Sequence, residues 1–305
     1  MCGIVGLHLR DPELYPRLGA LLETMLCQMG DRGPDSAGVA VYGDHRRVPP
    51  GHSAVSLLPG DTPVDELAAA LRAVLPGEPE LVVTEAGVTT VVAAPVDRDA
   101  LVTAARTALP TARVIGFGDD LAVYKGIGHP KTLAGVYDLA NAQGWQGLGH
   151  TRMATESAVN PEGCHPFSVG PDQCLVHNGS FANHATIRRE LQAAGHVFDS
   201  ENDTEVGARF VADRLMQGED LEKALRLLCE RFDGFYTLLV TSADGFAVVR
   251  DAIACKPAII AETDRWVAMA SEFRALAELP GIEDARLFEP EPERVYVWTR
   301  EGGRL

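Results

Sequence analysis

The stretch Cys2-Gly-Ile-Val-Gly-Leu-His-Leu9 places a cysteine directly before a run of mostly apolar residues. A short apolar run of this length is typical of a buried β-strand. The thiol would then lie at one end of that strand. An initiator methionine before a small residue is commonly removed, so we expect Met1 to be cleaved. Cys2 would then carry a free α-amine beside its thiol.

This combination makes Cys2 a candidate nucleophile. An α-amine has an unperturbed pKa of roughly 7.7–8.0, so much of it is neutral near pH 7 and can accept the proton of the thiol. A thiol beside its own base is an activated nucleophile. A cysteine arises at position 2 by chance at least as often as for catalysis, so the rest of the sequence has to decide.

Downstream of this strand, the sequence predicts a helix from about Asp11 to Gly30. Asp11 suits the N-cap, Pro12 suits the first helical position, and Glu13 adds an acid to the first turn. Gly30 can end the helix. Apolar residues at helical spacing form a stripe that we expect to join the core: Leu18, Leu21, Leu22, Met25, Leu26 and Met29.

In residues 44–147 predicted strands alternate with predicted helices, and this pattern predicts a small inserted α+β segment. A Pro- and Gly-rich stretch, Val48 to Gly60, would lead into it. The predicted order is a helix at 64–75, strands within 81–94, a helix at 99–109, and a strand and loop at 114–124. The segment is either a surface for a partner or an enlargement of the domain, and both interpretations remain open.

From residue 149 onward, short polar motifs alternate with apolar runs. Each motif alone has a simple structural explanation. Arg152 could form a surface ion pair, His177-Asn-Gly179 a type I′ turn, and Asp203 a helix N-cap. The four motifs in order are Gly149-His-Thr-Arg-Met-Ala-Thr155, Gly163-Cys-His-Pro-Phe167, His177-Asn-Gly179 and Asn202-Asp-Thr-Glu205.

In this order the motifs resemble the class II glutamine amidotransferases. The resemblance covers roughly residues 1–43 and 148–275, and the segment 44–147 lies outside the general family pattern. It also includes Arg32-Gly-Pro-Asp35, which we interpret as a structural turn near the nucleophile. Further matching positions are Cys2-Gly-Ile-Val-Gly6, Arg250-Asp251, Lys256-Pro257 and Ser271-Glu272.

The resemblance implies a role for each matching residue. Cys2 would supply the nucleophilic sulfur and the basic amine, with the oxyanion held by the Asn178 side chain and the backbone N–H of Gly179. Arg152 would clamp the glutamine α-carboxylate, Asp203 would take the α-ammonium, and Thr155 is assigned with them to substrate binding. No metal or organic cofactor is expected in this chain for glutamine hydrolysis.

The resemblance also implies a fold and a partner. The expected fold is α+β: a four-layer α/β/β/α N-terminal-nucleophile hydrolase sandwich over residues 2–305, with 44–147 inserted. We find no acceptor-domain motif, so ammonia would pass to a separate synthase subunit. The sequence of residues 149–157 is most similar to that of the detached amidotransferase subunit of glutamate synthase-like and N-methylglutamate synthase systems. FMN and iron–sulfur clusters would then belong to a partner subunit.

Two other functions compete with this hypothesis. One is a catalytically silent glutamine-sensing or scaffold subunit, although a binder does not need the Cys2 thiol. The other is hydrolysis of a different amide, which the Arg152 and Asp203 pair disfavours. Two departures from the family, Met153 and Glu156, concern coupling to an acceptor more than hydrolysis.

Composition excludes several partners. The chain has 305 residues, 27 Lys and Arg against 43 Asp and Glu, and a net charge of −16. Such a surface repels nucleic acid and anionic membranes. No apolar run reaches the length of a membrane span and no secretory signal is visible, so we expect a cytoplasmic protein. The six cysteines form no CxxC pair, which argues against a structural zinc site.

Overall fold

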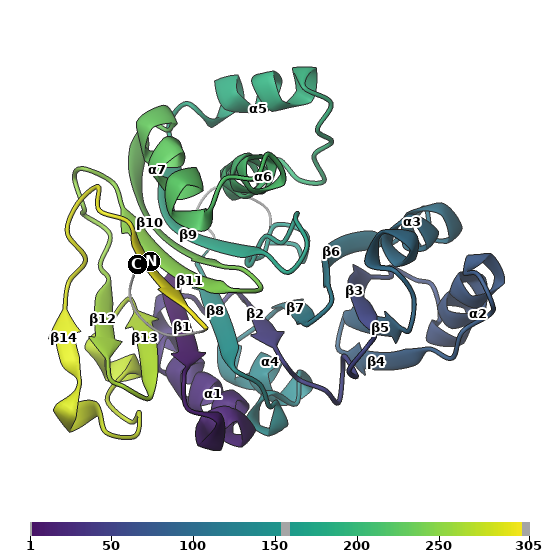
Figure 1. The fold of residues 1–305 in the computed structure, drawn as a ribbon, viewed down its shortest axis with the longest axis horizontal. Coiled ribbons are helices and arrows are strands. Elements are labelled where there is room, and N and C mark those ends of the chain that lie inside the picture. The colour runs from purple at the N-terminus through teal and green to yellow at the C-terminus, as the bar shows by residue number, and fades with distance from the viewer. Residues whose placement is uncertain (1, 154–158, 301–305) are drawn as a thin grey trace.

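The protein, as a computed structural model, is described over residues 2–153 and 159–300. Its largest sheet has seven strands in the order β14-β12-β13-β1-β8-β2-β7, all neighbours antiparallel (Figure 1). The central strands are buried along their whole length, and most of their residues are apolar or small. The exception is β8, which also buries Gln146, His150, Thr151 and Arg152. The strands are β1 (Gly3–Leu9), β2 (Ser36–Tyr42), β7 (Leu121–Ile127), β8 (Gln146–Arg152), β12 (Ile259–Glu262), β13 (Trp266–Ala270) and β14 (Arg286–Phe288).

A second, four-stranded sheet packs on the first in the order β15-β11-β10-β9. Strands β10 and β11 form a hairpin, because Thr241 at the end of β10 pairs with Phe246 in β11. Ile4, Leu239 and Phe246 belong to the apolar core cluster that draws on both sheets. The strands are β9 (Cys174–Phe181), β10 (Gly234–Thr241), β11 (Gly245–Arg250) and β15 (Tyr296–Thr299).

Helices cover the outer face of each sheet. On the seven-stranded sheet lie α1 (Leu18–Gln28) and α4 (Pro130–Val136); on the four-stranded sheet lie α5 (His184–Ala193), α6 (Asp203–Met216) and α7 (Leu221–Arg231) (Figure 1). This arrangement confirms the predicted α/β/β/α sandwich, here called the main sandwich. Short 3₁₀ helices connect its elements: η1 (Pro12–Arg17), η2 (Gly30–Arg32), η3 (Leu139–Asn141), η4 (Phe273–Ala275) and η5 (Ile282–Asp284).

The helix predicted from Asp11 to Gly30 is divided in the structure. Asp11 does act as an N-cap, accepting a hydrogen bond from the Glu13 N–H at 2.9 Å, but it caps η1. The α-helix starts only at Leu18, and Pro16 lies inside η1. Proline removes a backbone donor, which disfavours a continuous α-helix through this position.

A third sheet, in the order β4-β5-β3-β6, forms an inserted unit between β2 and β7. One face carries two helices over a core of aliphatic residues, while Ala54, Val91 and Ala93 pack toward the main sandwich. The unit spans a narrower range than 44–147, because β7 and α4 belong to the main sandwich. Its elements are β3 (Ser53–Leu58), α2 (Val64–Val74), β4 (Val82–Ala86), β5 (Thr89–Ala94), α3 (Arg98–Ala108) and β6 (Arg113–Gly118).

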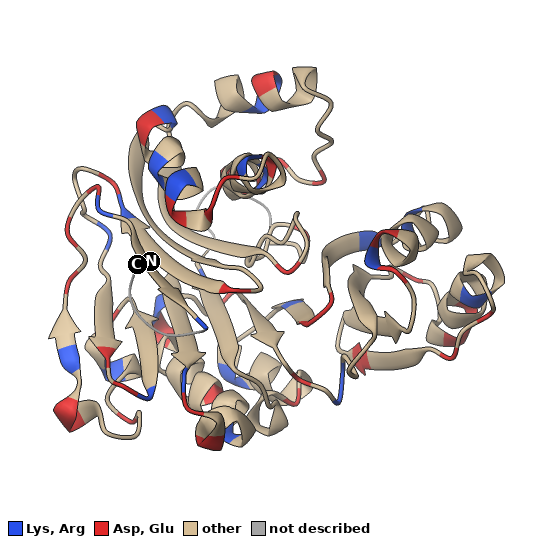
Figure 2. Ribbon diagram, viewed as in Figure 1, with Lys and Arg blue, Asp and Glu red and all other residues tan. Residues whose placement is uncertain are grey.

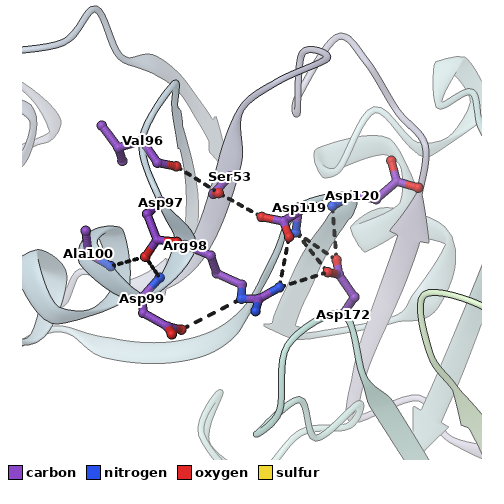
Figure 3. A network of polar contacts seen from close by, with 9 residues as sticks. All are labelled: Ser53, Val96, Asp97, Arg98, Asp99, Ala100, Asp119, Asp120 and Asp172. Atoms are coloured by element: carbon purple, nitrogen blue, oxygen red, sulfur yellow. Dashed lines mark hydrogen bonds and ion pairs between the residues drawn. The ribbon is translucent and has the colours of Figure 1, made fainter.

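A network of polar contacts joins the inserted unit to the main sandwich (Figure 3). The carboxylate of Asp172, just before β9, accepts hydrogen bonds from the backbone N–H groups of Asp119 and Asp120 at 2.9–3.0 Å. Asp119 in turn accepts from the Ser53 hydroxyl at 2.7 Å and from Arg98 at 2.8 Å. Asp172 therefore holds the turn through which the chain leaves the inserted unit.

Charged residues of both signs are interspersed over the outer helices α5 and α7 (Figure 2). Ion pairs link several of them, including Arg226 with Glu222 and Arg231 with Glu190. Such pairs are typical of solvent-exposed helix faces. Over residues 2–153 and 159–300, the helices are too short or too polar to span a membrane.

Candidate active site

Cys2 lies where the ends of β1 and β8 meet. Because Gly3 pairs with Thr151 across these strands, Cys2 is brought opposite the end of β8. The Cys2 Sγ lies 3.9 Å from the carbonyl oxygen of Met153. The Cys2 carbonyl accepts a hydrogen bond from Arg32 Nε at 3.0 Å, and Arg32 is paired with Glu272 at 2.5 Å. These contacts tie Arg32, for which a structural role was predicted, to the backbone of Cys2.

Asn178 on β9 reaches the same point from the second sheet. Its Nδ2 donates to the Cys2 carbonyl at 3.1 Å, and its Oδ1 is 3.1 Å from Nε2 of His150 on β8. With Nε2 protonated, His150 donates this bond, which orients the amide so that its NH₂ group faces Cys2. The amide of Asn178 is therefore fixed in one orientation against the backbone of Cys2.

Gly179 follows with a backbone conformation that only glycine adopts easily. Its φ is +132°, and a Cβ built on it would lie 1.9 Å from the carbonyl oxygen of Phe235 on β10. A side chain there would push β9 and β10 apart. The His177-Asn-Gly179 motif is thus part of a paired strand, since Asn178 pairs with Thr237, and the type I′ turn is ruled out.

Three buried histidines stand behind Asn178. The His150 and His165 ring centroids are 4.0 Å apart, and Thr204 Oγ1 lies 2.9 Å from both His165 Nε2 and His177 Nδ1. Burial lowers the pKa of His150 to about 3, although its bond to Asn178 opposes the shift. Burial also lowers the pKa of His165 well below its usual value, with repulsion from His150 adding to it. The cluster is therefore neutral near pH 7.

The structure also brings Arg152 toward the start of α6. The Arg152 guanidinium, largely buried, donates to the Gly163 carbonyl at 3.3 Å, and Asn202 Nδ2 donates to the same oxygen at 3.3 Å. Asn202, not Asp203, is the N-cap of α6, because its side chain accepts from the Thr204 N–H at 2.9 Å. The capping explanation for Asp203 is therefore wrong.

Asp203 instead turns toward β9. One carboxylate oxygen accepts from the Phe181 N–H at 2.9 Å, and the other lies 3.8 Å from His177 Nδ1. Burial lowers the pKa of His177, and the negative charge of Asp203 opposes that shift. About a fifth of the Asp203 side chain is exposed, so its carboxylate group remains partly accessible beside the buried histidines.

Most predicted site residues thus converge, and some supporting residues were missed. Cys2, Arg152, Asn178, Gly179 and Asp203 gather at one end of the two sheets, whereas Thr155 lies outside the described residues. Roles for His150, His165, His177 and Thr204 were not predicted, although each stands within a quoted motif. Among the described residues, no cluster of three His, Cys, Asp or Glu side chains could hold a metal ion.

Comparisons with known proteins agree with this geometry. Residues 150–278 match a family model described as a glutamine amidotransferase domain. The glutamine amidotransferase-like protein GlxB of Rhizobium meliloti (strain 1021) is 47% identical over 304 residues, covering 99% of both chains. The chain belongs to the class II glutamine amidotransferases. This confirms the predicted enzyme class, while the glutamate synthase-like assignment stays a prediction.

More distant relatives match parts of the amidotransferase or its fold. The amidophosphoribosyltransferase of Methanocaldococcus jannaschii is 32% identical over 165 residues, which cover 53% of this chain and 35% of that protein. A solved glutamine phosphoribosylpyrophosphate amidotransferase from B. subtilis superposes with a TM-score of 0.63 at 17% identity. The superposition covers 100% of this chain but only 49% of the B. subtilis protein. At 17% identity this similarity supports the fold alone.

Proposed function

We propose that this amidotransferase hydrolyses L-glutamine through a thioester on Cys2 and passes the ammonia to a separate synthase subunit. The observation that carries the proposal is the hydrogen bond from Asn178 Nδ2 to the Cys2 carbonyl at 3.1 Å. It ties an oriented side-chain amide to the backbone of the cysteine that precedes β1. The proposal requires that Met1 is removed, so that the amine of Cys2 is free.

The reaction would proceed in two halves. The Cys2 sulfur attacks the side-chain carbonyl carbon of glutamine, and the thiol proton moves to the α-amine of the same residue. The oxyanion is held by Asn178 Nδ2 and by the N–H of Gly179, which stay oriented because His150 fixes the amide and β10 fixes the glycine. The ammonium then protonates the leaving nitrogen, and ammonia departs. Water, activated by the same amine, cleaves the thioester and releases glutamate.

Substrate recognition would use the two charges that every free amino acid carries. Arg152 would bind the α-carboxylate, for which a planar guanidinium is better suited than an ammonium. Asp203 would bind the α-ammonium with its accessible carboxylate. The shared contact of Arg152 and Asn202 with the Gly163 carbonyl supports this pairing, since it ties the arginine to the residue before Asp203. Thr155 is proposed as a further contact.

The acceptor would lie on another polypeptide. We propose a synthase of the glutamate synthase-like type as this partner, with FMN and iron–sulfur clusters in its subunits and no cofactor in this chain. This step rests on the resemblance of residues 149–157.

Glutamate release from glutamine tests the catalytic proposal. We expect the wild-type chain to release glutamate and Cys2→Ala to release none above the uncatalysed rate. Cys255→Ala is the matched control, because Cys255 is an exposed free cysteine, and its rate should equal that of the wild type. Equal rates for wild type and Cys2→Ala would exclude the nucleophile. An intact mass that retains Met1 in active protein would exclude the basic amine.

Co-purification with the native chain tests the partner. We expect a synthase polypeptide with a flavin absorption spectrum and bound iron. A partner that lacks both would refute the glutamate synthase-like assignment and leave the hydrolysis mechanism standing. This result is therefore independent of the Cys2 assay.

A further inference from the structure

The hydroxyl of Thr204 meets three polar side chains behind the active site. Thr204 stands in the first turn of α6, directly after Asp203, and is only 1% exposed. Its Oγ1 lies 2.9 Å from His165 Nε2, 2.9 Å from His177 Nδ1 and 3.4 Å from Asp203 Oδ1. His177 belongs to β9, and His165 lies in the segment before it. One hydroxyl therefore joins three segments of the chain.

The number of protons limits how these contacts can be made. A hydroxyl donates one hydrogen bond and accepts two, a neutral imidazole carries a single N–H, and a carboxylate only accepts. Burial lowers the pKa of both His165 and His177, so the two rings are neutral near pH 7. The one proton of the hydroxyl cannot serve both rings. At least one histidine must therefore donate to Thr204.

The second nitrogen of each ring shows where the protons lie. His165 Nδ1 and His177 Nε2 are both buried, and neither has a hydrogen-bond partner within residues 2–153 and 159–300. A proton on either nitrogen would be a buried N–H without an acceptor, which is costly. The protons therefore belong on His165 Nε2 and His177 Nδ1, and both rings donate to Thr204 Oγ1.

This arrangement leaves the hydroxyl proton of Thr204 for Asp203. Both acceptor positions of Oγ1 are filled by the two rings, and Asp203 Oδ1 is the carboxylate oxygen within reach, at 3.4 Å. The other oxygen of that carboxylate accepts from the Phe181 N–H at 2.9 Å. Asp203 is thus held by one donor on each oxygen. A separation of 3.4 Å is long for a hydroxyl donor, so this bond is weaker than the two from the rings.

We propose that Thr204 is a positioning residue for the substrate: because His165 and His177 donate to it, its hydroxyl proton is directed to Asp203 and orients that carboxylate toward the α-ammonium of glutamine. The effect on substrate binding rests on the proposed function, in which Asp203 takes the ammonium. The proton arrangement does not rest on it, and the two are measured separately.

Nitrogen NMR of the whole chain, with isotope-labelled histidine, tests the proton arrangement without any substitution. At pH 7 we expect the Nε2–H form of His165 and the Nδ1–H form of His177, each assigned through its bonds to the backbone. A proton on His165 Nδ1 or on His177 Nε2 would overturn the inference, because the hydroxyl proton of Thr204 would then be used by that ring. This result is independent of any glutaminase activity.

Glutamate release tests the effect on substrate binding. Thr204→Val keeps the shape of the side chain without its hydroxyl, and we expect the glutamine KM to rise about fivefold while kcat stays within about twofold. Thr204→Ser restores the hydroxyl and should restore the KM. Thr132→Val is the matched control, an exposed threonine in the first turn of α4, and should keep the wild-type KM.

Glutaramate, which is glutamine without its α-amino group, separates positioning from general support. Its inhibition constant against glutamine should be the same for wild type and Thr204→Val, since it has no ammonium for Asp203 to bind. Equal losses for glutamine and glutaramate would make Thr204 a structural support and overturn the inference, as would an unchanged glutamine KM. If Thr204→Val does not fold, Thr204→Ala takes its place with the same expected contrast.

The two proposals fail in different ways. Glutamate release by the wild type without this contrast refutes the role of Thr204 and leaves the Cys2 mechanism standing. No release by the wild type refutes the proposed function and, with it, the positioning of Asp203 for a substrate.

Discussion

The main sandwich and the inserted unit bury different kinds of side chain. The inserted unit has a core of aliphatic residues such as Leu67, Leu71 and Leu101. The sandwich buries Arg152, three histidines and Asn178 at one end of its sheets. Burying polar groups costs free energy unless they are hydrogen-bonded, so a fold does not keep them without use. The buried polar residues of the main sandwich therefore indicate a functional site, whereas the aliphatic core of the inserted unit indicates mainly how that unit is stabilised.

Of the changes that test this contrast, removal of the Asn178 side-chain amide should have the largest effect, which is on kcat. Asn178→Ala deletes one oxyanion donor, so we expect kcat for glutamine hydrolysis to fall about 10²–10³-fold. The fold should survive, which circular dichroism would check. The control is Asn141→Ala, which replaces an exposed asparagine whose side chain donates to Asp138, and its kcat should be unchanged. If both variants hydrolyse glutamine equally fast, Asn178 is not an oxyanion donor.

Gly179→Ala should destabilise the protein by about 3 kcal/mol or more, because it combines a strained backbone with a clash. The clash is with the Phe235 carbonyl, which cannot move without breaking the β9–β10 pairing. Gly195→Ala is the matched control: its φ is also positive, at +96°, but nothing lies within 4 Å of the added Cβ. We expect it to cost about 1 kcal/mol. Urea unfolding measures both, and similar losses would show that the clash is relieved.

Arg152→Lys tests whether the buried arginine binds substrate. Replacing a two-pronged guanidinium by an ammonium should lose about 1.5–3 kcal/mol of charged hydrogen bonding, which raises the glutamine KM roughly 10–100-fold. Arg226→Lys, at an exposed ion pair with Glu222, should leave KM unchanged. An unaltered KM for Arg152→Lys would reject the clamp and leave the arginine as a structural link to the Gly163 carbonyl.

The histidine cluster should make the sandwich sensitive to mild acid. The pKa of His150 is about 3 in the folded protein and near 6.5 unfolded, so the unfolded state takes up the proton first. Stability is therefore full above pH 6.5 and falls as pH drops; His150 alone should cost about 2 kcal/mol between pH 6.5 and 5. His150→Gln should flatten the slope measured by urea unfolding at several pH values, and His52→Gln, at a half-exposed site, should not. An identical slope in both variants would contradict the assignment.

The sandwich could be predicted because the proposed chemistry needs particular residue types, and the motifs that carry them follow one another in a characteristic order along the chain. Cys2, Arg152, Asn178, Gly179 and Asp203 were all predicted, and the structure places them together. What the sequence could not reveal was contact between distant segments. Thr204 bridges two histidines that are 12 residues apart, a contact with no local signal. Asn202 takes the capping role proposed for Asp203; Asn and Asp are about equally good N-caps, so local preference does not choose between them.

The limits of the inserted unit were harder to predict for a related reason. Strands β6 and β7 are both rich in apolar residues, so the sequence does not indicate that they belong to different sheets. The separation comes from pairing: β7 pairs with β2, with Tyr42 opposite Leu121, whereas β6 pairs with β3. Sheet membership is a tertiary property, and a one-dimensional pattern of apolar residues does not contain it.

The smallest predicted effect concerns the contact between the two regions. Asp172→Asn should cost about 1–2 kcal/mol, because one of two acceptor oxygens becomes an NH₂ group facing the N–H groups of Asp119 and Asp120. Asparagine tolerates the positive φ of +48° at this position, so backbone strain adds little.

Hydrogen exchange separates this effect from general destabilisation. In Asp172→Asn, the amides of Asp119 and Asp120 should exchange faster than those of β10, because the Asp172 contacts drawn in Figure 3 lie at the junction. Asp97→Ala is the comparison within the inserted unit: it removes the N-cap of α3, costs about 1 kcal/mol and should leave the junction amides protected. If exchange rises equally in β10 and at the junction, the inserted unit and the sandwich unfold as one, and the contrast between them is one of composition alone.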